Sequence, residues 1–267
     1  MKKILLNTVR ESVISKRTKY LLPAIWCIGA VASSTVYAVD SFSGFAPVPY
    51  PSSSALTTFT TFTVFGQTAI TNTGPSYIGG SLGSPTTITG FSYPAINATN
   101  GIYTGFMNVN DDVTTQGTAD INAKKTTLLA MLCDVIPLPP SLGGFTVNPG
   151  VYCSSGAVTF TTGTLTLNAN NDPNATFVFK INGALTVTGT TPGGGTSASP
   201  KIVLINGANQ ANVYWVTIGS AATLTDTQFL GNIIAEAAIT LTRVNLQGRA
   251  LTTAAEVTMT ASTVNSS

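Results

Sequence analysis

The sequence predicts a mainly β protein of the solenoid class, in which short parallel strands coil around a common axis. One phrase, in which threonine alternates with an apolar residue, occurs three times near the end of the chain, at Ala222–Thr225, Ile239–Thr242 and Val257–Thr260. The copies are offset by 17 and 18 residues. Such a period is too short for a helical hairpin repeat, but it accommodates three short strands and their turns, which make one coil of a β-solenoid.

The alternation assigns each strand of the phrase a core side and a solvent side. Successive side chains of a strand point to opposite faces, so the two threonines share one face and the apolar residue between them takes the other. Leu224, Leu241 and Met259 are therefore expected in the core. Gly231 and Gly248, again 17 residues apart, predict a corner between the two other short strands of each coil, because a tight bend favours a residue without a Cβ.

The start of the chain is typical of a secretion signal. A basic stretch precedes an apolar run of about a dozen residues, and Val36-Tyr37-Ala38 suits signal peptidase, so removal of residues 1–38 is expected. The apolar run is too short for a membrane helix, and no later segment is long enough for one. The protein is predicted to be secreted or periplasmic, without membrane contact once the signal is removed.

Removal of the signal reverses the net charge. The whole chain carries 12 Lys+Arg and 10 Asp+Glu, but six of the cations and one acid lie in residues 1–38, which leaves a formal charge of −3. Nucleic-acid binding rests on clustered cations, so no nucleic-acid partner is expected. Residues 57–267 are predicted to form a single β-domain, preceded by an irregular, proline-containing lead-in at 39–56.

The first half of this domain is predicted to contain coils, a loop region and one helix. Residues 57–91 alternate threonine with β-branched and aromatic residues and indicate about one and a half coils. Residues 91–110 lose the alternation, which favours a loop-rich cap over an open end of the core. Residues 111–132 predict a helix with Asp111 or Asp112 as its N-cap, lying along one side of the solenoid. Its apolar stripe would consist of Ile121, Leu128, Leu129 and Leu132.

Two cysteines remain after the signal has been removed, Cys133 at the end of the predicted helix and Cys153 in a later β segment. In an oxidising compartment an even pair is expected to form a disulfide, which would join helix to sheet; two buried free thiols are the alternative. From residue 157 the coils resume, and residues 212–216 predict a buried strand. The turn Asn168–Asn174 is rich in possible calcium ligands, but a long turn needs the same residues, so no metal is predicted.

An ordered set of motifs resembles a known family. FTVFGQTAITNTGPSYIGGSLG, TLTLNANNDPNATFVFKI, NVYWVTIGSAATL and FLGNIIAEAAITL are similar to segments of the DUF3494 ice-binding proteins, which are secreted microbial antifreeze proteins. The resemblance extends from about Phe62 to Met259. It implies an irregular, right-handed, three-faced β-solenoid with one long α-helix packed alongside and a capping loop region, in which coil order departs from chain order. A disulfide like Cys133–Cys153 occurs in one branch of the family.

The repeated threonines are the residues expected to contact ice. Neighbouring strands lie about 4.8 Å apart and alternate side chains about 6.7 Å apart, and these distances are near the lattice repeats of ice. The protein is therefore expected to adsorb to an ice crystal as a monomer, with antifreeze or recrystallisation-inhibiting activity and without a cofactor. The candidate ice-contact residues are Thr186, Thr188, Thr223, Thr225, Thr240, Thr242, Asn245, Thr258 and Thr260.

The turn motif of the family, Thr-(Ala/Gly)-x-(Thr/Asn), is only partly present. The corresponding turns begin at Thr225 and Thr242, and only Thr242 and Asn245 fit the ends of the motif. Asp226 and Arg243 occupy the position that is small in the family. These two residues are 17 positions apart and are expected to stack on adjacent coils.

Two other function classes are compatible with a β-solenoid, an enzyme and an adhesin. A polysaccharide-cleaving enzyme would need paired carboxylates or a base in a groove. The chain has no His, and its best candidate for a catalytic pair of carboxylates is Asp226 with Glu236, which is a weak one. An enzyme is therefore not expected. A surface adhesin or extracellular matrix protein without ice activity is the alternative, because threonine is also a favourable residue in any exposed strand.

Overall fold

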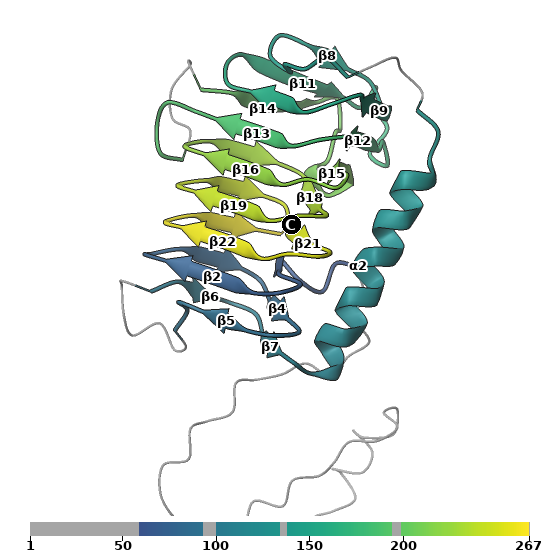
Figure 1. Cartoon of the computed structure of the whole chain (residues 1–267). Coiled ribbons are helices and arrows are strands. Elements are labelled where there is room, and N and C mark those ends of the chain that lie inside the picture. Colours follow the sequence, from purple (N-terminus) through teal and green to yellow (C-terminus); the bar gives the residue numbers. More distant parts are fainter. Residues whose placement is uncertain (1–58, 93–99, 134–137, 194–198, 267) are drawn as a thin grey trace, which may run out of the picture. The chain divides into compact units, whose positions relative to one another are not determined.

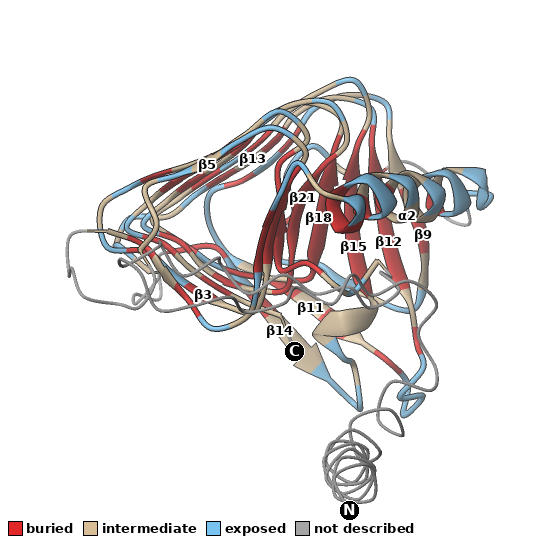
Figure 2. Cartoon of the chain, turned by 90° about the horizontal axis from the view of Figure 1, so that it is seen from below, coloured by how far each residue is buried: buried red, intermediate tan, exposed pale blue. Residues whose placement is uncertain are grey.

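The computed structural model describes residues 59–92, 100–133, 138–193 and 199–266. The expected signal peptide and the lead-in at 39–56 lie outside these residues. Within them the strands follow one another around three faces and stack in parallel, as Figure 1 shows from the side and Figure 2 along the stack. The predicted β-solenoid is confirmed.

The first face, called here the helix-covered face, is an eight-stranded sheet. In spatial order it contains β7 (Met107–Val109), β4 (Leu82–Ser84), β1 (Val64–Phe65), β21 (Ala250–Thr252), β18 (Asn232–Ala235), β15 (Val213–Thr217), β12 (Phe177–Ile181) and β9 (Gly150–Ser154). A short 3-10 helix, η1 (Gln210–Asn212), precedes β15.

The second face, called here the threonine face, is a seven-stranded sheet. In spatial order it contains β10 (Val158–Phe160), β13 (Leu185–Thr188), β16 (Ala222–Thr225), β19 (Ile239–Thr242), β22 (Val257–Thr260), β2 (Ile70–Thr73) and β5 (Ile88–Thr89).

The third face is divided between two smaller sheets. One contains β14 (Lys201–Ile205), β11 (Thr164–Asn168) and β8 (Thr146–Val147). The other contains β17 (Gln228–Leu230), β20 (Asn245–Gln247), β23 (Thr263–Asn265), β3 (Tyr77–Gly79) and β6 (Ile102–Tyr103).

The order of coils along the stack differs from the order along the chain. Strands β1 to β7 proceed to one end, α2 (Asp112–Ala130) runs along the stack, and the chain coils back from the other end (Figure 1). The last coil then pairs with the first: β21 with β1, β22 with β2 and β23 with β3. The departure from chain order that the resemblance implied is therefore present.

The helix α2 covers the outer side of the helix-covered face (Figure 2). Its N-cap is Asp111, whose carboxylate accepts a hydrogen bond from Thr114 N–H at 2.8 Å, while Asp111 N–H donates to Thr114 Oγ1. Ile121 and Leu128 are buried as predicted. Leu132 is 85% exposed, so its place in the apolar stripe was wrong, because the helix already ends at Ala130.

The core has two layers, one inside the coils and one beneath the helix. Strand β15 is buried on both sides: Val213 and Trp215 point inside, whereas Tyr214 and Val216 pack in the layer that includes residues of α2. This confirms the buried strand predicted at 212–216. Gly117 of α2 allows the close approach, since a Cβ there would lie 2.5 Å from a ring carbon of Phe62.

The expected loop-rich cap at 91–110 was partly wrong. Residues 93–99 lie outside the described residues, but β6 and β7 continue the third and helix-covered faces as part of the terminal coils. Both strands are short and contribute few buried side chains, which are Tyr103 in β6 and Met107 with Asn108 in β7. A segment of this kind shows no alternation that a sequence pattern could reveal.

The disulfide Cys133–Cys153 is present and joins the segment after α2 to β9. The double variant Cys133→Ser/Cys153→Ser is expected to lose about 3 kcal/mol in the free energy of unfolding, because the cross-link closes a loop of 20 residues in the unfolded chain. Guanidinium denaturation followed by circular dichroism would measure this loss. Reduced wild type is the control and should match the variant; equal midpoints for oxidised wild type and the variant would contradict the prediction.

Two further features limit the kinds of site that the fold offers. In the part of the chain that the structure describes, no helix has both the length and the apolar character needed to cross a membrane. The same residues contain no group of three or more His, Cys, Asp or Glu side chains placed to hold a metal ion.

Candidate functional site

The threonine face carries two columns of threonines that run across its strands. Parallel pairing places Thr223 beside Thr240 and Thr240 beside Thr258, in register. The inner column consists of Thr159, Thr186, Thr223, Thr240, Thr258, Thr71 and Thr89. The outer column consists of Thr188, Thr225, Thr242, Thr260 and Thr73.

The alternating residues of these strands fix the direction of the threonines. Leu224, Leu241 and Met259 have no exposed surface, as the sequence predicted. The column threonines are partly or fully exposed, so their hydroxyl and methyl groups lie at the surface. Figure 1 shows the strands of this face side by side from β13 to β5. The face is therefore a two-dimensional array with repeats of about 4.8 Å between strands and about 6.7 Å along each strand.

Most hydroxyl groups of the columns remain available to water. Among the described residues, Thr73 Oγ1 and Thr260 Oγ1 share a hydrogen bond of 2.9 Å, and Thr159 Oγ1 donates to the carbonyl oxygen of Pro140 at 3.1 Å. The other column threonines have no side-chain partner in that part of the chain. The array also contains no charged side chain within its columns.

Four members of the columns were not among the predicted residues: Thr71, Thr73, Thr89 and Thr159. Their strands carry the same alternation, but they lie outside the region where the phrase repeats. The phrase in β2 is further obscured because Asn72 takes the position of the apolar residue. Asn72 is buried there, and its side-chain amide donates to the carbonyl oxygens of Gly74 at 2.7 Å and Gly90 at 2.8 Å.

Asn245 is the one candidate that the structure separates from the columns. It begins β20 on the third face, where it pairs with Gln228 and Thr263. Thr242 and Asn245 lie on either side of a corner and belong to different sheets. The other eight candidates occupy the inner and outer columns.

The corner that follows the outer column repeats a left-handed backbone conformation. The residue after the outer threonine has φ of 52° at Asp226, 53° at Arg243, 46° at Ala261 and 94° at Gly74. In these four coils the corner has positive φ, which glycine adopts freely and other residues adopt at a cost. Small residues therefore suit it for a physical reason, and a charged pair is the exception.

Asp226 and Arg243 form this pair on adjacent coils, as expected. Arg243 Nε donates to Asp226 Oδ1 at 2.6 Å, and Arg243 Nη2 donates to Asp226 Oδ2 at 2.8 Å. The hydrogen bond from Arg243 holds the pKa of Asp226 below its usual value, with a smaller contribution from the charge of the guanidinium. The carboxylate therefore stays ionised at neutral pH.

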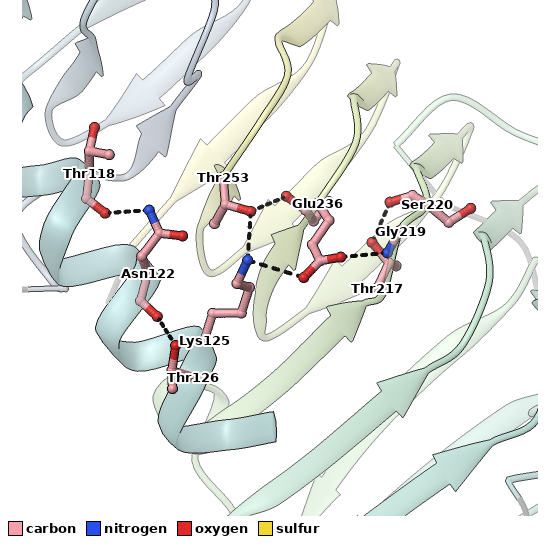
Figure 3. A network of polar contacts seen from close by, with 10 residues as sticks. Thr118, Asn122, Lys125, Thr126, Thr217, Gly219, Ser220, Glu236 and Thr253 are labelled. Atoms are coloured by element: carbon pink, nitrogen blue, oxygen red, sulfur yellow. Dashed lines mark hydrogen bonds and ion pairs between the residues drawn. The ribbon is translucent and has the colours of Figure 1, made fainter. Parts of the chain in front are cut away.

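Glu236 lies at the opposite end of the strands, in the corner before β19, and forms no pair with Asp226. It accepts hydrogen bonds from Lys125 Nζ of α2 at 3.1 Å and from Gly219 N–H at 2.7 Å, and Lys125 also contacts Thr253 (Figure 3). Partial burial acts to raise the pKa of Glu236, but the bonds to Gly219 and Lys125 lower it overall. Each carboxylate is thus held by a cation in a separate structural contact, which does not support catalysis by the pair.

Comparison with known proteins identifies similar chains. The Ice-binding-like family matches residues 64–265. The ice-binding protein of Nostoc sp. (strain HG1) is 42% identical over 233 residues, which cover 84% of this chain and 78% of that protein. Ice-binding protein 1 of Shewanella frigidimarina (strain NCIMB 400) is 41% identical over 127 residues, which cover 47% of this chain and 13% of that protein.

Solved structures show the same fold. An ice-binding protein from the Antarctic ascomycete Antarctomyces psychrotrophicus aligns with a TM-score of 0.67 at 30% identity, over 79% of this chain and 97% of that one. The DUF3494 domain of ice-binding protein 1 from Shewanella frigidimarina aligns with a TM-score of 0.66 at 29% identity, over 82% of this chain and 99% of that domain.

Proposed function

The chain belongs to the ice-binding-like (DUF3494) family, and we propose on this basis that it adsorbs to ice through the threonine face. The observation that carries the proposal is the pair of threonine columns. Seven coils contribute to the inner column in unbroken register, so the array extends over the whole sheet.

The array suits ice because its groups are fixed before contact. Threonine is β-branched and restricted at χ1, and each strand is anchored from below by buried residues such as Leu241. Little side-chain entropy is therefore lost when the surface binds. Methyl and hydroxyl groups at near-lattice spacings order a layer of water that can merge with the crystal. An ice front held at such points must curve between them, and a curved front freezes at a lower temperature.

The other two faces are less suitable. The helix-covered face lies beneath α2 (Figure 2). The third face is divided between two sheets, and one of its rows consists of Gln228, Asn245, Thr263, Tyr77 and Ile102, which do not share one chemical group. Neither face offers a lattice of like groups.

The proposal includes export and a single-chain active form. Residues 1–38 would direct secretion, and the disulfide fits an oxidising compartment. Residues 57–267 would then act as one domain and as a monomer, since a column of this length supplies the contact without a second copy. Ice would be the partner, with no cofactor and no nucleic acid.

Ice-affinity partitioning of the mature protein tests the function, with Thr240→Tyr as the decisive variant. Thr240 lies at the centre of the inner column, between Thr223 and Thr258, so a tyrosine ring there would hold the ice surface away from both neighbours. The wild type is expected to enter the ice fraction, and Thr240→Tyr is expected to remain in the liquid.

The matched control is Thr263→Tyr on the third face, where Thr263 is partly exposed like Thr240 and already lies beside Tyr77. This control should partition like the wild type. A wild type that stays in the liquid would contradict ice binding and favour an adhesin. Equal loss in both variants would contradict the choice of face.

A further inference from the structure

We propose that the Asp226–Arg243 pair is a specificity-determining element of the ice-contact surface, which confines the contact to the threonine face and so restricts the crystal planes that can be bound. This inference rests on the proposed function and deepens it. Its basis is the corner at which the outer column ends.

The corner changes its chemistry along the stack. In the coil of β13 it is occupied by Gly189, and in the coils of β22 and β2 by Ala261 and Gly74; none of these residues presents a polar side chain. In the two coils between them, those of β16 and β19, it is occupied by Asp226 and Arg243. The border of the threonine face is therefore charged at two adjacent coils and small and uncharged at the coils on either side of them.

Local backbone preference does not account for the arginine. An L-residue adopts the left-handed region at a cost in free energy, which glycine avoids and which aspartate offsets better than arginine. Arg243 nevertheless adopts φ of 53°. Its two hydrogen bonds to Asp226 span adjacent coils and hold both side chains at the corner.

The segment Gly189–Gly193 is hydrogen-bonded to the same two coils. Gly189 N–H donates to the carbonyl oxygen of Thr225 at 2.8 Å, and Gly193 N–H donates to the carbonyl oxygen of Arg243 at 2.8 Å. A Cβ on Gly189 would lie 1.9 Å from the carbonyl oxygen of Asp226. The segment from Gly189 to Gly193 therefore follows the corner from the coil of β13 to the coil of β19, directly beside the charged pair.

The physical consequence follows from hydration. A carboxylate and a guanidinium orient their first-shell water around the charge, and such an arrangement does not fit the ice lattice. Arg243 is the more exposed partner, with 44% of its side-chain surface accessible against 17% for Asp226. Ice in contact with the coils of β16 and β19 must therefore stop at the outer column. At the corners with Ala261 and Gly74 no charged side chain limits the contact.

Fluorescence labelling of single ice crystals would test this inference, because it shows which crystal planes a dye-labelled protein binds. The decisive variant is Asp226→Gly/Arg243→Gly, which gives all these corners a small residue and removes the left-handed strain. It is expected to label planes that the wild type leaves dark and to show a larger thermal hysteresis. Arg243→Lys retains the charge and should label the same planes as the wild type.

A second double variant, Asp226→Asn/Arg243→Gln, removes both charges with little change in side-chain size. It takes the place of the glycine variant if circular dichroism shows that the glycine variant is unfolded. It is expected to label additional planes as well. A folded uncharged variant that labels only the wild-type planes would overturn the inference while leaving ice binding intact. A wild type that labels no plane would overturn the proposed function, and this inference with it.

Discussion

Thr71→Tyr is expected to abolish ice affinity as completely as a substitution in the repeated phrases. Thr71 pairs with Thr258 on one side and with Thr89 on the other, so it continues the inner column into the first coils of the described chain. A tyrosine ring there would project above the array and separate the ice surface from both neighbours. Thermal hysteresis and ice-affinity partitioning would both measure the loss.

This result would show that two distant parts of the chain form one surface. The outer threonines of the same strands, Thr73 and Thr260, are 187 residues apart in sequence and share a hydrogen bond. Thr104→Tyr is a suitable control, because Thr104 is exposed and continues the third face from β6. Full activity in Thr71→Tyr, combined with loss in Thr240→Tyr, would restrict the contact to the later coils.

Trp215→Ala is expected to lower the free energy of unfolding by about 4 kcal/mol, near the middle of the range for large aromatic residues in a core. Trp215 is fully buried and stacks on Phe179 with ring centroids 4.0 Å apart, while the tilted ring of Phe229 lies 5.0 Å away. Its indole Nε1 donates to the carbonyl oxygen of Leu230 at 2.9 Å. Alanine would leave a cavity between three coils and a buried carbonyl without its partner.

Guanidinium denaturation followed by circular dichroism would measure this loss of stability. Trp215→Phe separates the two contributions, because it keeps an aromatic ring in the stack and removes the hydrogen bond. That variant is expected to lose only about 1–2 kcal/mol. A loss below about 1 kcal/mol in Trp215→Ala would show that the aromatic stack does not hold the coils together.

The contact with ice depends on this internal stack as well as on the surface. Tyr152, Phe179 and Trp215 stack through three successive coils, from β9 through β12 to β15. The same coils lead into β10, β13 and β16 of the threonine face. Rings in van der Waals contact thus support the strand spacing that the threonine array requires.

Several errors of the sequence-based interpretation have a common cause. Leu132 was assigned to the helix stripe by its spacing, yet the helix ends before it. Asn245 was grouped with the threonines because it lies three residues after Thr242, yet the corner between them places it on another face. In both cases the residue has the expected spacing along the chain. The spacing does not reveal where the helix ends or where the backbone turns a corner.

The amino-acid sequence alone was enough to predict the coil, the buried side of the repeated strands, the glycine corners, the helix and a disulfide between Cys133 and Cys153. Each depends on backbone geometry or residue chemistry within a short segment, or on a simple count. Only the tertiary structure decided that Thr71 and Thr89 extend the column beyond Thr258. The last coil would otherwise expose the edge of β22 and the core beside it, and the strands that cover this edge come from the first part of the described chain. Such pairing is set by the burial of an open end, which leaves no local pattern in the sequence.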